Sequence, residues 1–125
     1  ARLIGQRTEQ IQEDRTAAAR ILAEHYGVTI VLKGRHTVIA GPDGRIAISP
    51  TGNNGLATGG TGDVLAGLIG GLLAQGIAPF NAACIGVFLH GLAADIVVRT
   101  GSPRALIASD VIGALHAAWR LLEKE

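Results

Sequence analysis

Hydrophobic positions recur at helical spacing along the first part of the chain. Over residues 8–26, five side chains fall on one helical face: Ile11, Ala18, Ile21, Leu22 and His25. Thr8 suits the N-cap position, because its hydroxyl can accept from a free backbone N–H. Gly27 supplies the positive φ at which helices often end. The pattern predicts a helix from Thr8 to Tyr26.

Three short apolar runs follow this helix. Val28–Leu32 is apolar on both faces, which is typical of a strand whose sheet is covered on both sides, so we expect a central strand. Val38–Ala40 and Ile46–Ile48 flank the turn-forming residues Gly41–Gly44, which predicts a hairpin. We expect these two strands at the periphery of the sheet.

The second half of the chain combines a loop with further helical segments. Residues Ser49–Gly62 are rich in Gly and Asn and predict a long loop of the kind that often binds a ligand. Three helices are predicted after it: Thr61–Gln75, Pro79–Arg99 and Ser109–Lys124. In the first of these, Gly67, Gly70 and Gly71 each cost about 1 kcal/mol relative to Ala. We therefore expect another element to pack closely against them, with this helix at the centre.

The segment Val64–Ala94 contains no Asp, Glu, Lys or Arg, which raises the question of a membrane span. Four residues divide it into pieces of the length of core helices: Gln75, Gly76, Pro79 and Asn81. We therefore interpret both pieces as core helices and expect no membrane partner. On the second piece, His90 and Cys84 are expected to be core residues, and the spacing argues against an acid–base pair of His90 with Asp95.

Composition narrows the classes further. The 11 Lys and Arg nearly balance the 10 Asp and Glu, which argues against a nucleic-acid partner. A hydrophobic fraction of 48% against 17% charged residues predicts an ordered core. The single cysteine, Cys84, excludes an internal disulfide, and no leader-like segment opens the chain, so we expect a cytoplasmic protein.

The element inventory is short for an independent domain. One helix and three strands precede three helices, which leaves the expected central strand without parallel neighbours, and the sequence contains no Met. We therefore expect part of a larger α/β protein. Its open sheet edge would be covered by a missing N-terminal half or by self-association as a homo-oligomer.

The chemistry concentrates in the segment Thr51–Gly67. Gly59, Gly60 and Gly62 allow backbone N–H groups to converge at a helix N-terminus, where an anion such as phosphate is favoured. Asp63 is the one carboxylate there and could accept a proton from a substrate hydroxyl during phosphoryl transfer. The alternative is an acidic residue that only complements the helix dipole.

The ending Gly60-Thr61-Gly62-Asp63 resembles that of the ribokinase-like superfamily, and the chain more closely resembles the NAD(P)H-hydrate dehydratases. Further matches support that family: Leu32-Lys33-Gly34, Thr51-Gly52-Asn53, Gly55-Leu56-Ala57 and Leu89-His90-Gly91-Leu92-Ala93. The resemblance covers nearly the whole chain but only the C-terminal half of the family's length. It implies a partial three-layer α/β unit of about three strands and four helices.

The resemblance also implies an activity and a site. The family uses ADP or ATP, with Mg²⁺, to dehydrate the S form of hydrated NADH or NADPH, a repair of damaged cofactor. Asp63 would be the catalytic base and, with Asn53, would contact the substrate. The implied nucleotide-binding residues are Lys33, Gly34, Arg35, His36, Thr37, Gly59, Gly60, Thr61 and Gly62. Arg35 and His36 stand where small residues are usual, so their side chains are expected to point outward.

Two other functions stay open at this point. A small-alcohol kinase resembling hydroxyethylthiazole kinase shares the Gly-Thr-Gly-Asp ending. The third possibility is an inactive nucleotide-binding fragment, which the short inventory of strands favours.

Overall fold

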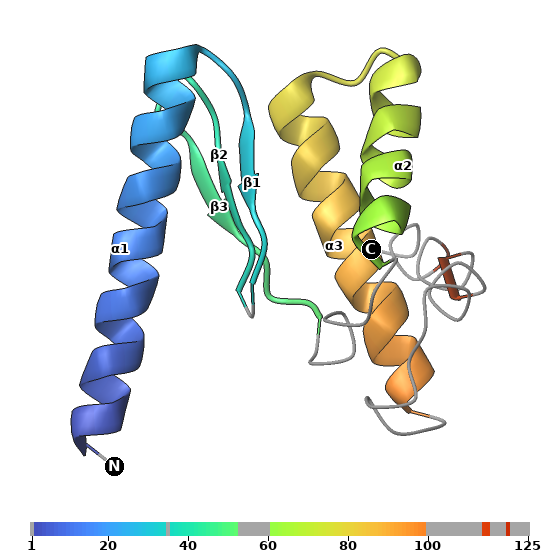
Figure 1. Ribbon diagram of the computed structural model, residues 1–125. Coiled ribbons are helices and arrows are strands. Elements are labelled where there is room, and N and C mark those ends of the chain that lie inside the picture. The colour runs from blue at the N-terminus through green and yellow to red at the C-terminus, as the bar shows by residue number, and fades with distance from the viewer. Residues whose placement is uncertain (1, 35, 53–60, 100–113, 116–119, 121–125) are drawn as a thin grey trace. The chain divides into compact units, whose positions relative to one another are not determined.

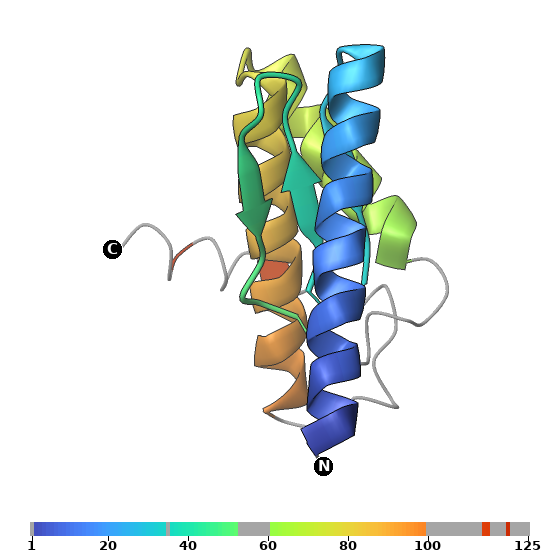
Figure 2. The ribbon, with the colours of Figure 1, turned by 90° about the vertical axis from the view of Figure 1, so that its left-hand side faces the viewer.

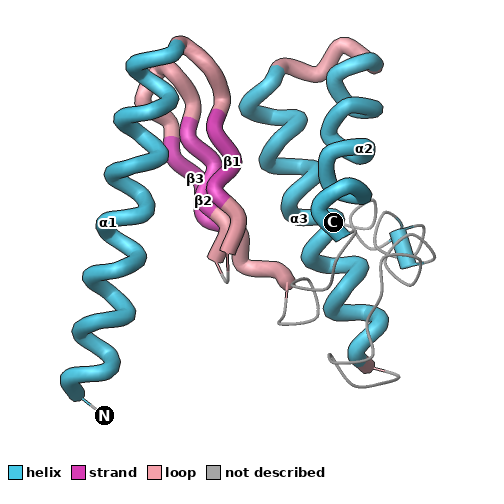
Figure 3. Tube along the Cα trace, viewed as in Figure 1, coloured by secondary structure: helices cyan, strands magenta, loops and turns pink. Residues whose placement is uncertain are grey.

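The computed structural model describes residues 2–34, 36–52, 61–99, 114–115 and 120 of the chain. It divides into two compact units, Ala1–Ile48 and Ser49–Glu125, and each is considered by itself. The first unit holds one helix and a three-stranded sheet, and the second holds two long helices (Figures 1 and 3). The predicted α/β class is confirmed.

Helix α1, Arg2–Tyr26, is longer than the sequence pattern predicts. The N-cap at Thr8 is wrong, because residues 2–7 contain no Pro and continue the helix upstream. The predicted end is confirmed: Gly27 has φ 65°. The Val28 N–H donates to the Ala23 carbonyl at 3.2 Å, and this bond closes the last turn.

The sheet is antiparallel, with β1 (Ile30–Leu32), β2 (Val38–Ala40) and β3 (Ile46–Ile48) in the order β1-β2-β3. Ile30 pairs with Ala40, and Ala40 pairs with Ile46. The hairpin and the peripheral place of β3 are therefore confirmed, but the places expected for β1 and β2 are wrong. Among the described strands, β2 is central and buried, whereas β1 lies at an edge and is half-buried.

Helix α1 lies against the sheet (Figure 2), and small side chains make the contact. Ala19 and Ala23 are buried against Val38 and Ala40 of β2. The predicted apolar face is wrong, since Ile11 and Ile21 are 57% and 65% exposed. Alanines one turn apart permit a closer approach of helix to sheet than the branched side chains would.

The second unit begins with helix α2, Thr61–Ala74, and continues into helix α3, Pro79–Val98. Both bounds agree with the prediction to within one residue. Gly76, at φ 88°, ends α2: its N–H donates to Leu73 at 2.9 Å, and the Ile77 N–H donates to Leu72 at 3.3 Å. Pro79 then occupies the first turn of α3, where its missing N–H costs nothing.

The two helices lie side by side and share a core (Figure 1). A Cβ placed at Gly86 of α3 would lie 2.6 Å from Cγ1 of Ile69, so this glycine permits the close contact. The expectation for α2 is wrong: Gly67, Gly70 and Gly71 are exposed, and a Cβ at any of them would meet no described atom within 4 Å. The close approach uses a glycine of α3 instead.

The predicted helix Ser109–Lys124 lies mostly outside the described residues. Ala114 and Leu115 are helical, and Ala114 is buried with Leu89, Ala93 and Ala94. By length and composition alone, α3 could cross a membrane, but core helices share that composition and half of its apolar stretch is buried. His90 is buried on α3, as expected for a core histidine.

Candidate functional site

The loop between β1 and β2 carries the first group of predicted site residues. Lys33, Gly34 and His36 are exposed, and Thr37 is half-buried, whereas Arg35 lies outside the described residues. The Thr37 hydroxyl donates to the Gly34 carbonyl at 3.3 Å, which closes the loop on itself. The outward direction expected for the side chains of Arg35 and His36 stays a prediction.

Arg15 of α1 supports this loop from inside the unit. Its Nη2 donates to the carbonyls of Leu32 at 3.1 Å and Lys33 at 3.2 Å. Its Nη1 donates to the carbonyl of His36 at 3.4 Å and to Oε1 of Gln12 at 3.0 Å. One guanidinium thus holds carbonyls from both ends of the loop.

Gly34 is needed for this contact. A Cβ at Gly34 would lie 2.8 Å from the central carbon of the Arg15 guanidinium, which is closer than side-chain carbons approach each other. Any other residue would displace either the loop or the guanidinium. Packing against Arg15 therefore explains the glycine of the Leu32-Lys33-Gly34 motif.

The second unit contains the predicted anion site at the start of α2. The helix begins at Thr61, as predicted, with Gly62 half-buried and Asp63 exposed in its first turn. The first N–H groups of a helix have no partner within it, and its dipole favours negative charge there. Asn53, Gly59 and Gly60 lie outside the described residues, so their predicted contacts stay predictions.

The connection Ser49–Gly52, which precedes the glycine-rich segment, is tied to α3. The Thr51 hydroxyl donates to the Phe88 carbonyl at 2.9 Å. The Gly52 N–H donates to Oδ2 of Asp95 at 3.1 Å. A Cβ at Gly91 would lie 2.6 Å from the carbonyl carbon of Thr51. Gly91 therefore lets the connection lie directly on the helix.

This contact gives a physical reason for two of the motifs. Thr51-Gly52 and His90-Gly91 are distant in sequence but pack against each other within the second unit. Gly52 adopts φ 111°, which favours glycine, and its N–H meets the Asp95 carboxylate. Neither Asp95 nor Arg15 was predicted as a site residue.

Both residues left a signal in the sequence. Arg15 stands one turn before Ala19 and two before Ala23, so it continues the stripe that α1 buries. A charged residue in line with buried alanines must meet polar groups, here the loop carbonyls. Asp95 is the one Asp, Glu, Lys or Arg in the sequence of α3, and a carboxylate on an apolar helix needs polar groups around it where it is buried.

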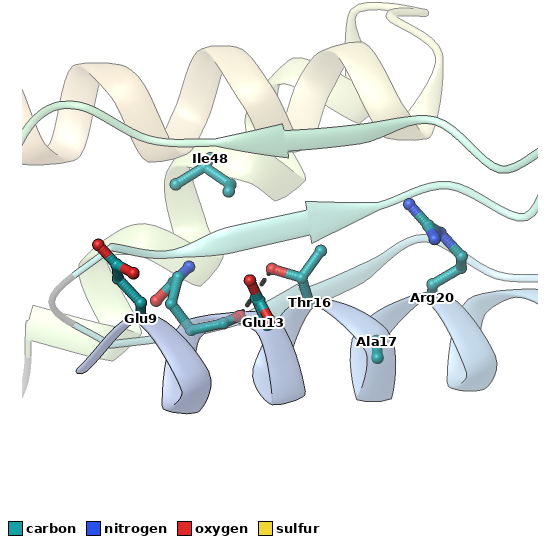
Figure 4. A pocket seen from close by; sticks show the side chains of 7 residues that line it. Glu9, Glu13, Thr16, Ala17, Arg20 and Ile48 are labelled. Atoms are coloured by element: carbon teal, nitrogen blue, oxygen red, sulfur yellow. Dashed lines mark hydrogen bonds between the residues drawn. The ribbon is translucent and has the colours of Figure 1, made fainter. Parts of the chain in front are cut away.

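The first unit also has an open groove of about 400 Å³ between α1 and β3 (Figure 4). Six residues of α1 and one of β3 line it: Glu9, Gln12, Glu13, Thr16, Ala17, Arg20 and Ile48. It contains none of the predicted site residues. Among the described residues, no group of three His, Cys, Asp or Glu side chains could hold a metal ion.

Two features indicate the class: an α/β arrangement, and a helix that begins at Thr61 and carries Gly62-Asp63 in its first turn, after a segment rich in glycine. Comparison with known families identifies the class more closely. The chain belongs to the family of NAD(P)H-hydrate dehydratases, which matches residues 1–115.

Individual relatives agree with this family. The chain is 49% identical over 120 residues to an ADP-dependent (S)-NAD(P)H-hydrate dehydratase of Neisseria meningitidis, covering 95% of this chain. It is 47% identical over 125 residues to a bifunctional NAD(P)H-hydrate repair enzyme of Moorella thermoacetica. Among solved structures, an ADP/ATP-dependent NAD(P)H-hydrate dehydratase of Bacillus subtilis, co-crystallized with ATP/Mg²⁺, superposes with a TM-score of 0.83 at 39% identity.

The chain spans less than half the length of these relatives. It covers 40% of the Neisseria protein, 24% of the Moorella protein and 40% of the Bacillus structure, which itself covers 90% of this chain. The similarity therefore extends over nearly all of this chain but over only part of each relative.

Proposed function

We propose that this chain contributes to the ADP- or ATP-dependent dehydration of the S form of hydrated NADH or NADPH. The observation that carries the proposal is the position of Asp63, which is exposed in the first turn of α2 directly after Gly62. Relatives that share this part of the chain are named for that reaction. The function is thus repair of a damaged nicotinamide cofactor.

Asp63 is the general base in this proposal. Its carboxylate takes the proton of the hydrate's hydroxyl, whose oxygen attacks the terminal phosphorus of ADP and releases AMP. The phosphorylated oxygen then leaves as inorganic phosphate, pushed by the lone pair of the ring nitrogen. The neighbouring ring carbon loses a proton, and the double bond of the dihydropyridine is restored.

The proposal includes main-chain donors for phosphate in each of the two units. The Lys33–Thr37 loop offers N–H groups and the charge of Lys33, and the N-terminus of α2 offers the N–H groups that follow Gly59–Gly62. Glycine at these positions permits a phosphate to approach the backbone closely.

Mg²⁺ belongs to the proposal as a companion of the nucleotide. Magnesium is often held by one or two carboxylates together with substrate phosphates. In this proposal the nucleotide carries the ion, which would neutralise the charge of its phosphates, while Asp63 keeps its role as the base.

A small-alcohol kinase is the second candidate, because the Gly60–Asp63 ending serves both reactions. The products distinguish a dehydratase from a kinase. We expect incubation with hydrated NADPH and ADP to restore the absorbance of the reduced nicotinamide and to release AMP and free phosphate in equal amounts. Accumulation of a stable phosphomonoester, with no recovery of that absorbance, would instead identify a kinase.

A further inference from the structure

We propose that Arg15 is a positioning residue that turns the main-chain N–H groups of Lys33, Gly34 and Thr37, in the loop between β1 and β2, toward the phosphates of bound ADP. The inference rests on the nucleotide role proposed for that loop. It concerns a residue of α1 that lies 17 positions before the first carbonyl it binds. Arg15 itself does not touch the nucleotide in this account.

Arg15 makes hydrogen bonds to several backbone carbonyls. Its guanidinium is half-buried and donates to three loop carbonyls, those of Leu32, Lys33 and His36, at 3.1–3.4 Å. Gln12 Oε1 accepts from Nη1 at 3.0 Å, and Gln12 Nε2 donates to the His36 carbonyl at 3.5 Å. Gln12 thus holds the guanidinium in place and shares one of its acceptors.

The direction of these carbonyls also sets the direction of the N–H groups in the same peptide units. The described peptide bonds are trans, so the C=O and N–H of each unit point in opposite directions. When the carbonyls of Leu32, Lys33 and His36 face Arg15, the N–H groups of Lys33, Gly34 and Thr37 face away from it. Successive N–H groups on one side of a loop form a cavity that suits an anion.

Arginine suits this position better than lysine. The planar guanidinium has five donors in a fixed arrangement and can serve several carbonyls at once. A lysine ammonium would keep the positive charge but could not reach carbonyls at both ends of the loop with the same geometry. Replacement by lysine therefore separates the effect of loop geometry from the effect of charge.

The test compares Arg15→Lys with Arg20→Lys, a matched change on the same helix at an exposed arginine outside the loop contacts. ADP is titrated into each labelled protein, and the backbone amide signals of Lys33, Gly34 and Thr37 are followed by NMR. We expect ADP to shift these signals in the wild type and in Arg20→Lys. In Arg15→Lys we expect the affinity to fall about tenfold, as for the loss of charge-assisted bonds.

Steady-state kinetics supply a second readout. Arg15→Lys should raise KM for ADP about tenfold and leave kcat within about twofold, because Asp63 is untouched. A loss that was only structural would lower the folded fraction and hence the apparent kcat. Unchanged KM and unchanged amide shifts in folded Arg15→Lys would overturn the proposal.

Gln12→Ala gives a second variant if Arg15→Lys does not fold, because it removes the acceptor 3.0 Å from Nη1 of Arg15 and leaves the loop sequence unchanged. A rise in KM for ADP in the same direction is expected. Gln10→Ala, a change at an exposed glutamine of α1 that bonds Asp14, is the control. Wild-type affinity in Gln12→Ala would contradict the proposal. If ADP shifts these amide signals but no dehydration occurs, this inference stands and the proposed function is refuted. If dehydration occurs but ADP does not shift these signals, the proposed function stands and this inference is refuted.

Discussion

Asp63 is the only carboxylate in the segment Thr51–Gly67, and the proposed proton transfer depends on it. Asp63→Asn keeps the size of the side chain and one accepting oxygen but removes the base. We expect folding and ADP binding to persist while turnover of the hydrate falls by at least about 100-fold. Glu24→Gln, which removes an exposed carboxylate on α1, should keep wild-type turnover. Turnover of Asp63→Asn near the wild-type value would refute the general-base role.

A second residue-scale prediction concerns pH and the tip of the hairpin. The Arg45 N–H donates to Asp43 at 3.1 Å, and this bond, followed by the charge and side chain of Arg45, holds the pKa of Asp43 below its ordinary value of 3.8. A lowered folded-state pKa adds stability above the unfolded value, and the gain is lost as pH falls through the folded value. NMR titration should therefore give Asp43 a midpoint below 3.8.

The variant Arg45→Ala identifies the cause of that shift. It removes the guanidinium, which lies 2.7 Å from Asp43 Oδ2, but keeps the backbone N–H. The midpoint should rise only in part if the backbone bond is the main cause. A return to the ordinary value would assign the effect to the side chain instead.

The structural role of a residue could be predicted from the sequence where its immediate neighbours determine that role. Gly27 and Asp63 have roles that their immediate neighbours define, a helix end and a first-turn acid, and both occur where the sequence predicts them. Arg15 and Asp95 act on backbone groups 17 or more positions away, and helical or strand periodicity carries no information about such contacts.

At the scale of elements, the connection Ser49–Gly52 depends on glycine at position 91 of α3. Gly91→Ala would place a methyl group against the backbone of Thr51 and Gly52, neither of which can rotate away. We expect a loss of about 1–3 kcal/mol in the free energy of unfolding, as for other overpacking changes. Chemical denaturation measures it directly.

The matched control for Gly91→Ala is Gly67→Ala on α2. Here the methyl group meets no described atom within 4 Å, so the higher helix propensity of alanine determines the effect. We expect the free energy of unfolding to rise by up to about 1 kcal/mol. Equal effects of the two substitutions would contradict the contact between the connection and α3.

The elements themselves were largely predictable, because turn residues mark their ends. Gly76 and Pro79 separate α2 from α3, and the turn Gly41–Gly44 separates β2 from β3. The burial of α1 was not predictable from its branched apolar residues. It uses Ala19 and Ala23, and the choice of small side chains depends on the distance to the sheet, which sequence periodicity does not encode.

At the scale of the whole molecule, the sheet offers an open edge. Among the described strands, β1 pairs with β2 on one side only, and Ile30–Leu32 are half-buried. Unpaired strand groups beside apolar side chains favour association. We therefore predict that the isolated 125-residue chain self-associates or binds a separate N-terminal half. Multi-angle light scattering tests this, and a soluble monomer that unfolds cooperatively would contradict it.

Phosphorylation is proposed to turn the hydrate's hydroxyl into a leaving group, and an oxygen label follows the hydroxyl oxygen directly. Hydrated NADPH that carries a heavy oxygen isotope in its hydroxyl is converted with unlabelled ADP, and the released phosphate is analysed by mass spectrometry. We expect one labelled oxygen in each phosphate, because the hydrate oxygen attacks phosphorus before its bond to carbon breaks. Label recovered in water, with none in phosphate, would show that the hydroxyl leaves without phosphorylation and would contradict the account.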